Sequence, residues 1–173
     1  MKSKLSALIF ASALLLLLAG VASADDYDDT IAVFKKSGES AAFFDHSYGY
    51  AVFPSIGKGG LGVGAAHGSG RVYEQGKHVG DVKMNQISVG LQAGGQAFRE
   101  VIFFKDKTAL DDFTRGNFEF QGGLSAVALK EGVSKSLNYN KGVAVVSAAK
   151  GGLMAEASVG GQKFKYEPVK ENP

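Results

Sequence analysis

Hydrophobic and polar residues follow two different periods along the chain, and the change between them separates a helical part from a strand-rich part. Between residues 29 and 46 the apolar and small side chains recur every three or four positions, which lines one face of a helix. These positions are Ile31, Phe34, Gly38, Ala41 and Ala42. The pattern predicts one amphipathic helix from Asp29 to about His46, preceded by acidic residues that suit the positive end of its dipole.

After residue 48 the period changes to two, which is typical of strands. Pro54 is expected to end the first strand, and Gln75-Gly76 is expected to form a hairpin turn. Asp106 is expected to cap a short helix that runs through Phe113 and stops at Gly116. The predicted strands are residues 50–53, 71–74, 78–82, 87–93, 97–104, 118–128, 142–148, 153–159 and 163–166.

The most informative stretch lies between Gly60 and Arg71, where one of the two strand faces has almost no side chains. The even positions are Gly60, Gly62, Gly64, Ala66, Gly68 and Gly70. Glycine is costly inside a strand, so a bare face indicates close approach of a helix or of another backbone. We therefore expect an α+β fold: a strongly twisted antiparallel sheet or partial barrel, with the N-terminal helix packed on the glycine-rich face. A flexible glycine-rich loop is the alternative.

The first 24 residues have the pattern of a signal peptide. Lys2 and Lys4 precede an apolar run, and Ala22-Ser23-Ala24 fits the small-residue rule for cleavage. We expect cleavage near Ala24, a single domain over residues 25–173, and a periplasmic or secreted protein. An uncleaved, membrane-anchoring helix is the alternative.

Composition removes several classes of function. The chain has no cysteine, which excludes disulfides, thiolate nucleophiles and cysteine-ligated zinc. It has 19 Lys and Arg residues against 17 Asp and Glu residues, and the counts become equal without Lys2 and Lys4. Basic charge is therefore no argument for nucleic-acid binding. No nucleotide, nucleophile-elbow or metal-ligand motif has the required spacing, so we expect no cofactor and no metal.

Several basic residues lie next to aromatic or glycine-rich segments. Together they could rim an apolar patch and pair with anionic lipid headgroups, although an ordinary mixed surface would have the same composition. These candidate lipid-binding residues are Lys35, Lys36, Lys58, Arg71, Lys77 and Lys83.

Three ordered segments resemble landmarks of the SYLF domain family. They are residues 49–60 (GYAVFPSIGKGG), residues 90–96 (GLQAGGQ) and residues 151–155 (GGLMA). Lys58 matches the lysine of the family's opening signature. The resemblance implies a lipid-binding module; eukaryotic members join phosphoinositide-rich membranes and the actin cytoskeleton, and bacterial relatives are often exported.

The function we expect is non-catalytic binding of anionic phospholipid or a membrane surface. The alternative is a structural or protein-interaction domain of the cell envelope that binds a protein partner and no lipid. A hydrolase using His67 with Ser69 is a third hypothesis, because alternate strand positions would share one face.

Overall fold

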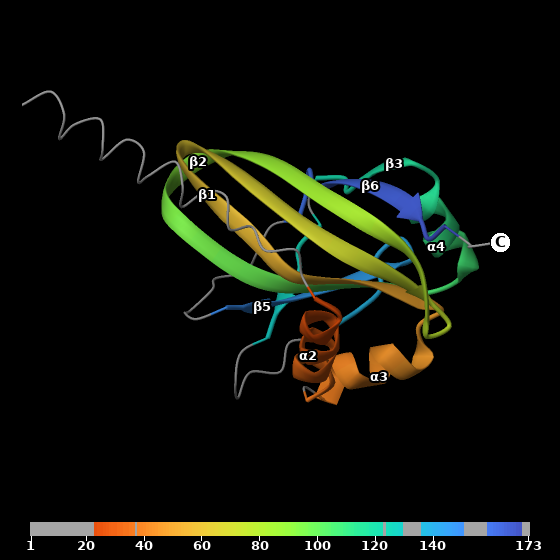
Figure 1. Cartoon of the computed structure of the whole chain (residues 1–173). Helices are drawn as coiled ribbons and strands as arrows, with labels where there is room; N and C mark the ends of the chain where they lie inside the picture. The colour runs from red at the N-terminus through yellow and green to blue at the C-terminus, as the bar shows by residue number, and fades with distance from the viewer. Residues whose placement is uncertain (1–22, 37, 123, 130–135, 151–158, 171–173) are drawn as a thin grey trace, which may run out of the picture.

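The computed structural model describes residues 23–36, 38–122, 124–129, 136–150 and 159–170. In chain order the elements are α2 (Ala24–Lys35), α3 (Gly38–His46), β1 (Gly49–Glu74), β2 (Lys77–Phe104), α4 (Lys107–Thr114), β3 (Asn117–Glu119), β4 (Val127–Ala128), β5 (Val143–Ala149) and β6 (Lys163–Pro168). Figure 1 shows one curled sheet with α2 and α3 together at one side.

One long antiparallel hairpin, β1 with β2, dominates the fold. The predicted turn is confirmed: Gln75 and Gly76 have φ angles of 51° and 81°, the left-handed values that a tight hairpin turn requires. The predicted end of the first strand at Pro54 is wrong. β1 continues past Pro54, because the pairing register shifts between Phe53 and Ile56, and a strand irregularity tolerates a residue without an N–H.

The other strands add to the free edge of β2. β5 pairs with the last part of β2, while β6 pairs with its first part. β3 then pairs with β6, and β4 pairs in parallel with β5. The sheet order β3-β6-β2-β5-β4, with β1 on the other edge of β2, is mostly antiparallel and confirms the predicted fold class.

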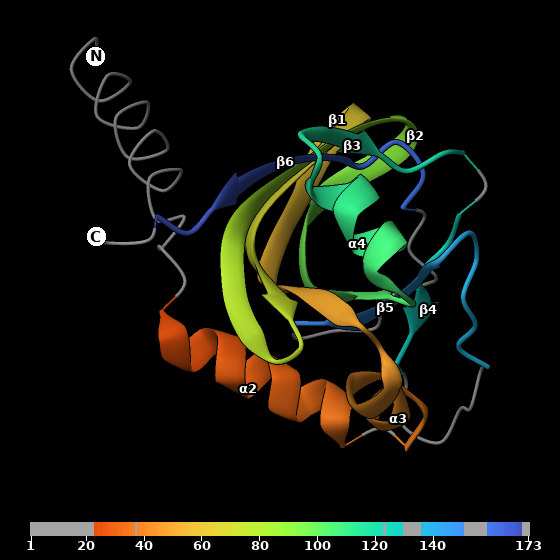
Figure 2. The ribbon, with the colours of Figure 1, turned by 90° about the vertical axis from the view of Figure 1, so that its right-hand side faces the viewer.

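The long hairpin folds over itself, which gives it a basal half and a distal half. The basal half comprises residues 49–57 and 97–104, and the distal half comprises residues 63–74 and 77–87. Gly60, with a φ angle of 148°, lies at the bend between them. Figure 2 shows both strands curling around the concave side of the sheet, where α4 packs.

The bare face of β1 is buried inside this curl. Gly64, Ala66, Gly68 and Gly70 are buried, while the alternate residues of the same stretch are exposed. A Cβ atom on Gly70 would lie 2.7 Å from the Phe53 ring. The glycines therefore let the distal half of β1 lie against its own basal half; at Gly68 and Gly70 the close neighbour is this strand and not the N-terminal helix.

The N-terminal helices cover the other side of the basal half, where α2 contacts β1. A cluster that includes Phe34 of α2 packs there on Val52, Val101 and Phe103. The prediction of a single helix is wrong, because the segment forms two helices, α2 and α3. Buried Ser40 at the start of α3 donates a hydrogen bond to the Phe34 carbonyl oxygen, which fixes the turn between them.

Of the remaining predictions, some are confirmed and others are wrong. Asp106 does cap α4, accepting a hydrogen bond from the Ala109 N–H at 2.9 Å, and β6 lies where the sequence places it. The predicted strand over residues 118–128 is wrong: only residues 117–119 and 127–128 pair as strands. The predicted strand 153–159 and the third family landmark fall almost entirely on residues 151–158, which lie outside the described residues. The predicted signal segment falls almost entirely on residues 1–22, which also lie outside the described residues.

Candidate functional site

The outward side chains of the distal half form parallel rows across β1, β2 and β6. The row nearest the bend is apolar: Ala65 pairs with Ile87, and Val63 lies one step further along. The exposed fractions of Ile87 and Val63 are 77% and 57%. We call Val63, Ala65 and Ile87 the apolar edge. Neighbouring exposed apolar side chains can form part of a contact surface.

The next two rows are basic and polar. Lys83 of β2 lies directly opposite Lys165 of β6, and Asn85 lies opposite Lys163. All four side chains are exposed. We call Lys83, Lys163 and Lys165 the lysine rows. Like charges directly opposite each other destabilise a sheet, so Lys83 and Lys165 concentrate positive charge here at some cost to stability.

A hollow in this face lies beside the lysine rows. Its volume is about 460 Å³. The residues that line it are Asn85, Asn117, Phe118, Glu119, Lys163, Phe164 and Lys165. Two ammonium groups and two side-chain amides thus surround a space of headgroup size, with Glu119 opposite Lys163 in the register of β3 and β6.

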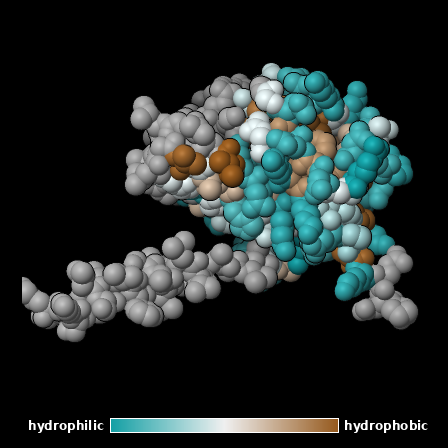
Figure 3. All heavy atoms as spheres, turned by 90° about the horizontal axis from the view of Figure 1, so that it is seen from above, coloured by the Kyte–Doolittle hydropathy of each residue, from teal (hydrophilic) through white to brown (hydrophobic). Residues whose placement is uncertain are grey.

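The row farthest from the bend is acidic, with Asp81 opposite Glu167. Along the strands the face therefore changes from apolar to basic to acidic. Successive rows are two residues apart, or about 7 Å at the usual rise of a strand. If the apolar edge entered a bilayer, the lysine rows would lie at headgroup level and the acids further out in water. Figure 3 shows apolar atoms exposed beside a largely hydrophilic surface.

The structure brings two of the six predicted basic residues to this face. Lys83 belongs to the lysine rows, and Arg71 pairs with Asp81 in the acidic row. The guanidinium carbon of Arg71 lies 4.3 Å from the centre of the Tyr27 ring, so this side chain also holds α2 against the sheet.

The other four predicted residues are spread over the molecule. Lys58 is partly exposed in β1 opposite Gln96, on the basal side of the bend. Lys35 has its ammonium 5.5 Å from the centre of the Phe44 ring, and Lys36 is the C-cap residue that follows α2. Lys77 is exposed at the start of β2. Their part in lipid binding stays a prediction.

Sequence reasoning missed Lys163, Lys165 and Ile87. The alternation Lys163-Phe164-Lys165-Tyr166 contains both lysines on one strand face. Ile87 follows Lys83 and Asn85 in the polar phase of β2, so an aliphatic residue at this position breaks the pattern. This break in the alternation is the sequence feature from which the apolar edge could have been predicted.

His67 and Ser69 are both exposed on the same face, as their spacing predicts. The Nδ1 atom of His67 lies 2.8 Å from the Oδ1 atom of Asn85, so the imidazole is oriented by an amide. Among the described residues, no three His, Asp or Glu side chains gather closely enough to hold a metal ion.

A buried carboxyl group lies away from this face, in the core between the two halves. Glu100 is fully buried, and its Oε2 atom accepts a hydrogen bond from Nε2 of Gln162 at 3.1 Å. Burial raises the pKa of Glu100 to about 7, although the hydrogen bond from Gln162 lowers it. Within the described part of the chain, Oε1 of Glu100 and Oε1 of Gln162 have no hydrogen-bond partner.

The fold and this face define a class: a curled α+β domain whose outer face changes from apolar to basic along its strands. No helix within the described residues is long and apolar enough to cross a bilayer.

The chain belongs to the Ysc84/SYLF family. Residues 85–170 match the family model Ysc84, described as a Las17-binding protein actin regulator. The chain is also similar to Beta cell expansion factor A of Aeromonas veronii, with 33% identity over 138 residues. That match covers 78% of this chain and 51% of the relative, so the chain spans about half the length of the relative. The resemblance seen in the sequence is thereby confirmed.

Proposed function

We propose that this domain binds the surface of anionic phospholipid membranes, without catalysis, through the apolar edge and the lysine rows. The observation that carries the proposal is the order of the rows: Ile87 and Ala65 first, then Lys163 and Lys83 with Lys165, then Asp81 with Glu167. An interfacial protein places apolar groups about 5–10 Å into the headgroup boundary and basic groups above them. This face has that order.

Each lysine near an anionic bilayer contributes about 1 kcal/mol. The three lysines together therefore contribute about 3 kcal/mol, or roughly a 100-fold change in affinity. Because exposed charges are screened by salt, binding should weaken as ionic strength rises.

Co-sedimentation with vesicles tests the proposal. The wild-type protein is expected to bind vesicles rich in phosphatidylglycerol at low salt and to bind pure phosphatidylcholine vesicles weakly. The variant K83Q/K163Q/K165Q is expected to lose roughly 100-fold in affinity. The matched control K105Q/K150Q/K170Q removes the same charge from exposed lysines elsewhere and should bind almost as wild type.

Two outcomes would contradict the proposal in different ways. If the wild-type protein fails to bind anionic vesicles at low salt, the membrane function is wrong. If the two triple variants lose affinity equally, the protein responds to net charge and the lysine rows are not the site.

We also propose that the protein is exported after cleavage near Ala24 and acts in the periplasm or outside the cell. The apolar run that follows Lys2 and Lys4 supports this. Intact mass spectrometry of the protein from fractionated cells tests it: a mature species beginning near Asp25 in the periplasmic or secreted fraction is expected, and a full-length species retained in the cytoplasm would contradict it.

A further inference from the structure

A second hollow lies on the other side of the short strand β3, between α4 and the turn that precedes β5. Its volume is about 360 Å³, which is within the usual range for small-molecule sites. Its lining includes Asp112, Glu119, Phe120, Leu124, Lys141 and Val143. We call it the α4 pocket.

The floor of the α4 pocket is apolar and continuous with the protein core. Phe120 and Val143 are buried members of the main core cluster, and Phe118, Leu124 and Ala109 pack against it. An alkyl group that entered here would leave water for a hydrocarbon surface, which is favourable in proportion to the area buried.

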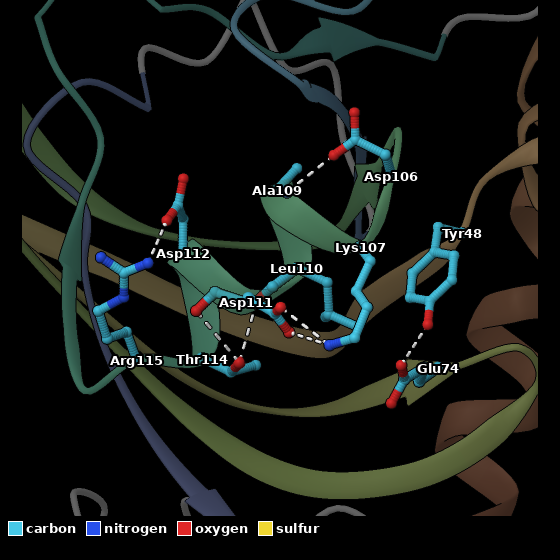
Figure 4. Close-up of polar contacts among 10 residues, drawn as sticks. All are labelled: Tyr48, Glu74, Asp106, Lys107, Ala109, Leu110, Asp111, Asp112, Thr114 and Arg115. Carbon is cyan, nitrogen blue, oxygen red and sulfur yellow. Dashed lines mark hydrogen bonds and ion pairs between the residues drawn. The ribbon is translucent and has the colours of Figure 1, made fainter.

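The rim carries two carboxyl groups, those of Asp112 and Glu119, and one ammonium group, that of Lys141. Asp112 is paired with Arg115 at 2.9 Å, and Figure 4 shows the two side chains turned toward each other on α4. Glu119 lies opposite Lys163 in the sheet register. Lys141 is exposed and makes no ion pair with any described residue. Its ammonium group is therefore available to an anion at the mouth of the pocket.

Lys141 lies at this rim in a backbone conformation that lysine rarely adopts. Lys141 has a φ angle of 49° and Gly142 a φ angle of 86°. Two backbone hydrogen bonds between Asn140 and Val143, of 2.7 and 3.1 Å, close the turn. A tight turn with positive φ at both central residues favours asparagine or glycine, so a lysine in the first position is costly and points to a role for its side chain.

We propose that the α4 pocket binds one molecule of a single-chain anionic amphiphile, with its alkyl chain on the Phe120–Leu124–Val143 floor and its anionic group at the Nζ atom of Lys141. This site is separate from the bilayer-binding face and takes a monomeric ligand. A free fatty acid and a single-chain lipid phosphate share the required chemistry.

Isothermal titration with laurate and with dodecyl phosphate, each below its critical micelle concentration, tests the proposal and separates the two sources. The wild-type protein is expected to bind at least one of them, and dodecanol at least tenfold more weakly. Lys141→Asn places a turn-favouring residue at the left-handed position, so its Tm should equal or exceed that of the wild type while affinity for the anionic ligand falls at least tenfold. Lys105→Asn is the control and should bind as wild type.

The site itself is checked by methyl NMR. Laurate should shift the signals of Leu124 and Val143, and Lys83→Gln, a change on the membrane face, should bind laurate as the wild type does, which distinguishes this pocket from that face. Shifts confined to Val63 and Ile87, unchanged affinity in Lys141→Asn, or no binding of either ligand would each overturn the proposal.

Discussion

The two halves of the long hairpin belong to the same two strands, but their outer faces differ. On the basal half, Val52, Val101 and Phe103 point outward and are fully buried, because α2 and α3 cover them. On the distal half, Val63 and Ile87 point outward and are exposed. Among the described residues, α2 reaches this second face only at Arg71, through Tyr27, and no helix covers Val63 or Ile87. The first apolar face therefore contributes to folding, and the second is the one that the proposed function assigns to membrane contact.

The largest expected effect concerns the outer face of the basal half, which α2 and α3 cover. Phe103 is fully buried, and its ring centroid lies 4.9 Å from that of Phe44 and 5.4 Å from that of Phe43. Phe103→Ala should lower the free energy of unfolding by about 3–5 kcal/mol, because it removes the contact between sheet and helices. Urea denaturation measures this. Lys83→Gln on the uncovered face should change stability by less than about 0.5 kcal/mol; equal losses would mean that both faces serve folding.

The next effect concerns the core, where Glu100 of the basal half meets Gln162, which lies just before β6, the strand that pairs with the distal half. The pKa of Glu100 is raised from 4.5 to about 7 in the folded protein. The folded state therefore keeps a proton that the unfolded chain has lost. This stabilisation is complete below pH 4.5 and is lost as the pH rises to 7, by about 3 kcal/mol.

Glu100→Gln keeps the size of the side chain and cannot ionise, so its free energy of unfolding should vary less with pH. The difference between the wild type and this variant, measured by urea denaturation from pH 4.5 to 8, isolates the contribution of Glu100. Parallel curves for the two proteins would mean that Glu100 titrates normally in the folded state.

A smaller effect is expected at the contact between the basal and distal halves of β1. Gly70→Ala should destabilise by about 1–3 kcal/mol, since the new Cβ would lie 2.7 Å from the Phe53 ring and from the Val52 carbonyl oxygen. Gly57→Ala is the matched control, because no atom lies within 4 Å of its added Cβ and the residue is exposed. Thermal unfolding compares them. If the Gly70 variant is as stable as the Gly57 variant, the glycine face is not the contact between the halves.

Much of the fold could be predicted from local pattern. The even-numbered glycines between Gly60 and Gly70 indicate a bare, closely approached face, and Asp106 and Gln75-Gly76 indicate a helix start and a turn. The element that packs on this face could not be predicted, because the alternation of glycines shows that one strand face lacks side chains but does not show which segment lies against it. The neighbour proved to be the beginning of the same strand, which depends on the bend near Gly60 and on a register shift between Leu61 and Val63.

The candidate site was less accessible to sequence reasoning. Lys83 could be chosen from its place in the predicted hairpin, but its row is completed by Lys165, which pairs with it only through the long-range contact of β2 with β6. Arg71 has the right charge, yet its guanidinium group packs on Tyr27. Local sequence gives the charge of a residue, whereas its role here depends on which strands become neighbours.

The most direct test of the central claim, that the apolar edge of the distal half contacts the membrane, uses the absence of tryptophan from the chain. Ile87→Trp places a single tryptophan on the apolar edge, and Val169→Trp places one at another exposed aliphatic position, 44% exposed, as the control. With anionic vesicles, the emission of the Ile87 variant should shift to the blue and be quenched by brominated acyl chains, while that of the Val169 variant stays unchanged. Vesicle binding without any change at position 87, or with the change at position 169 instead, would contradict the account.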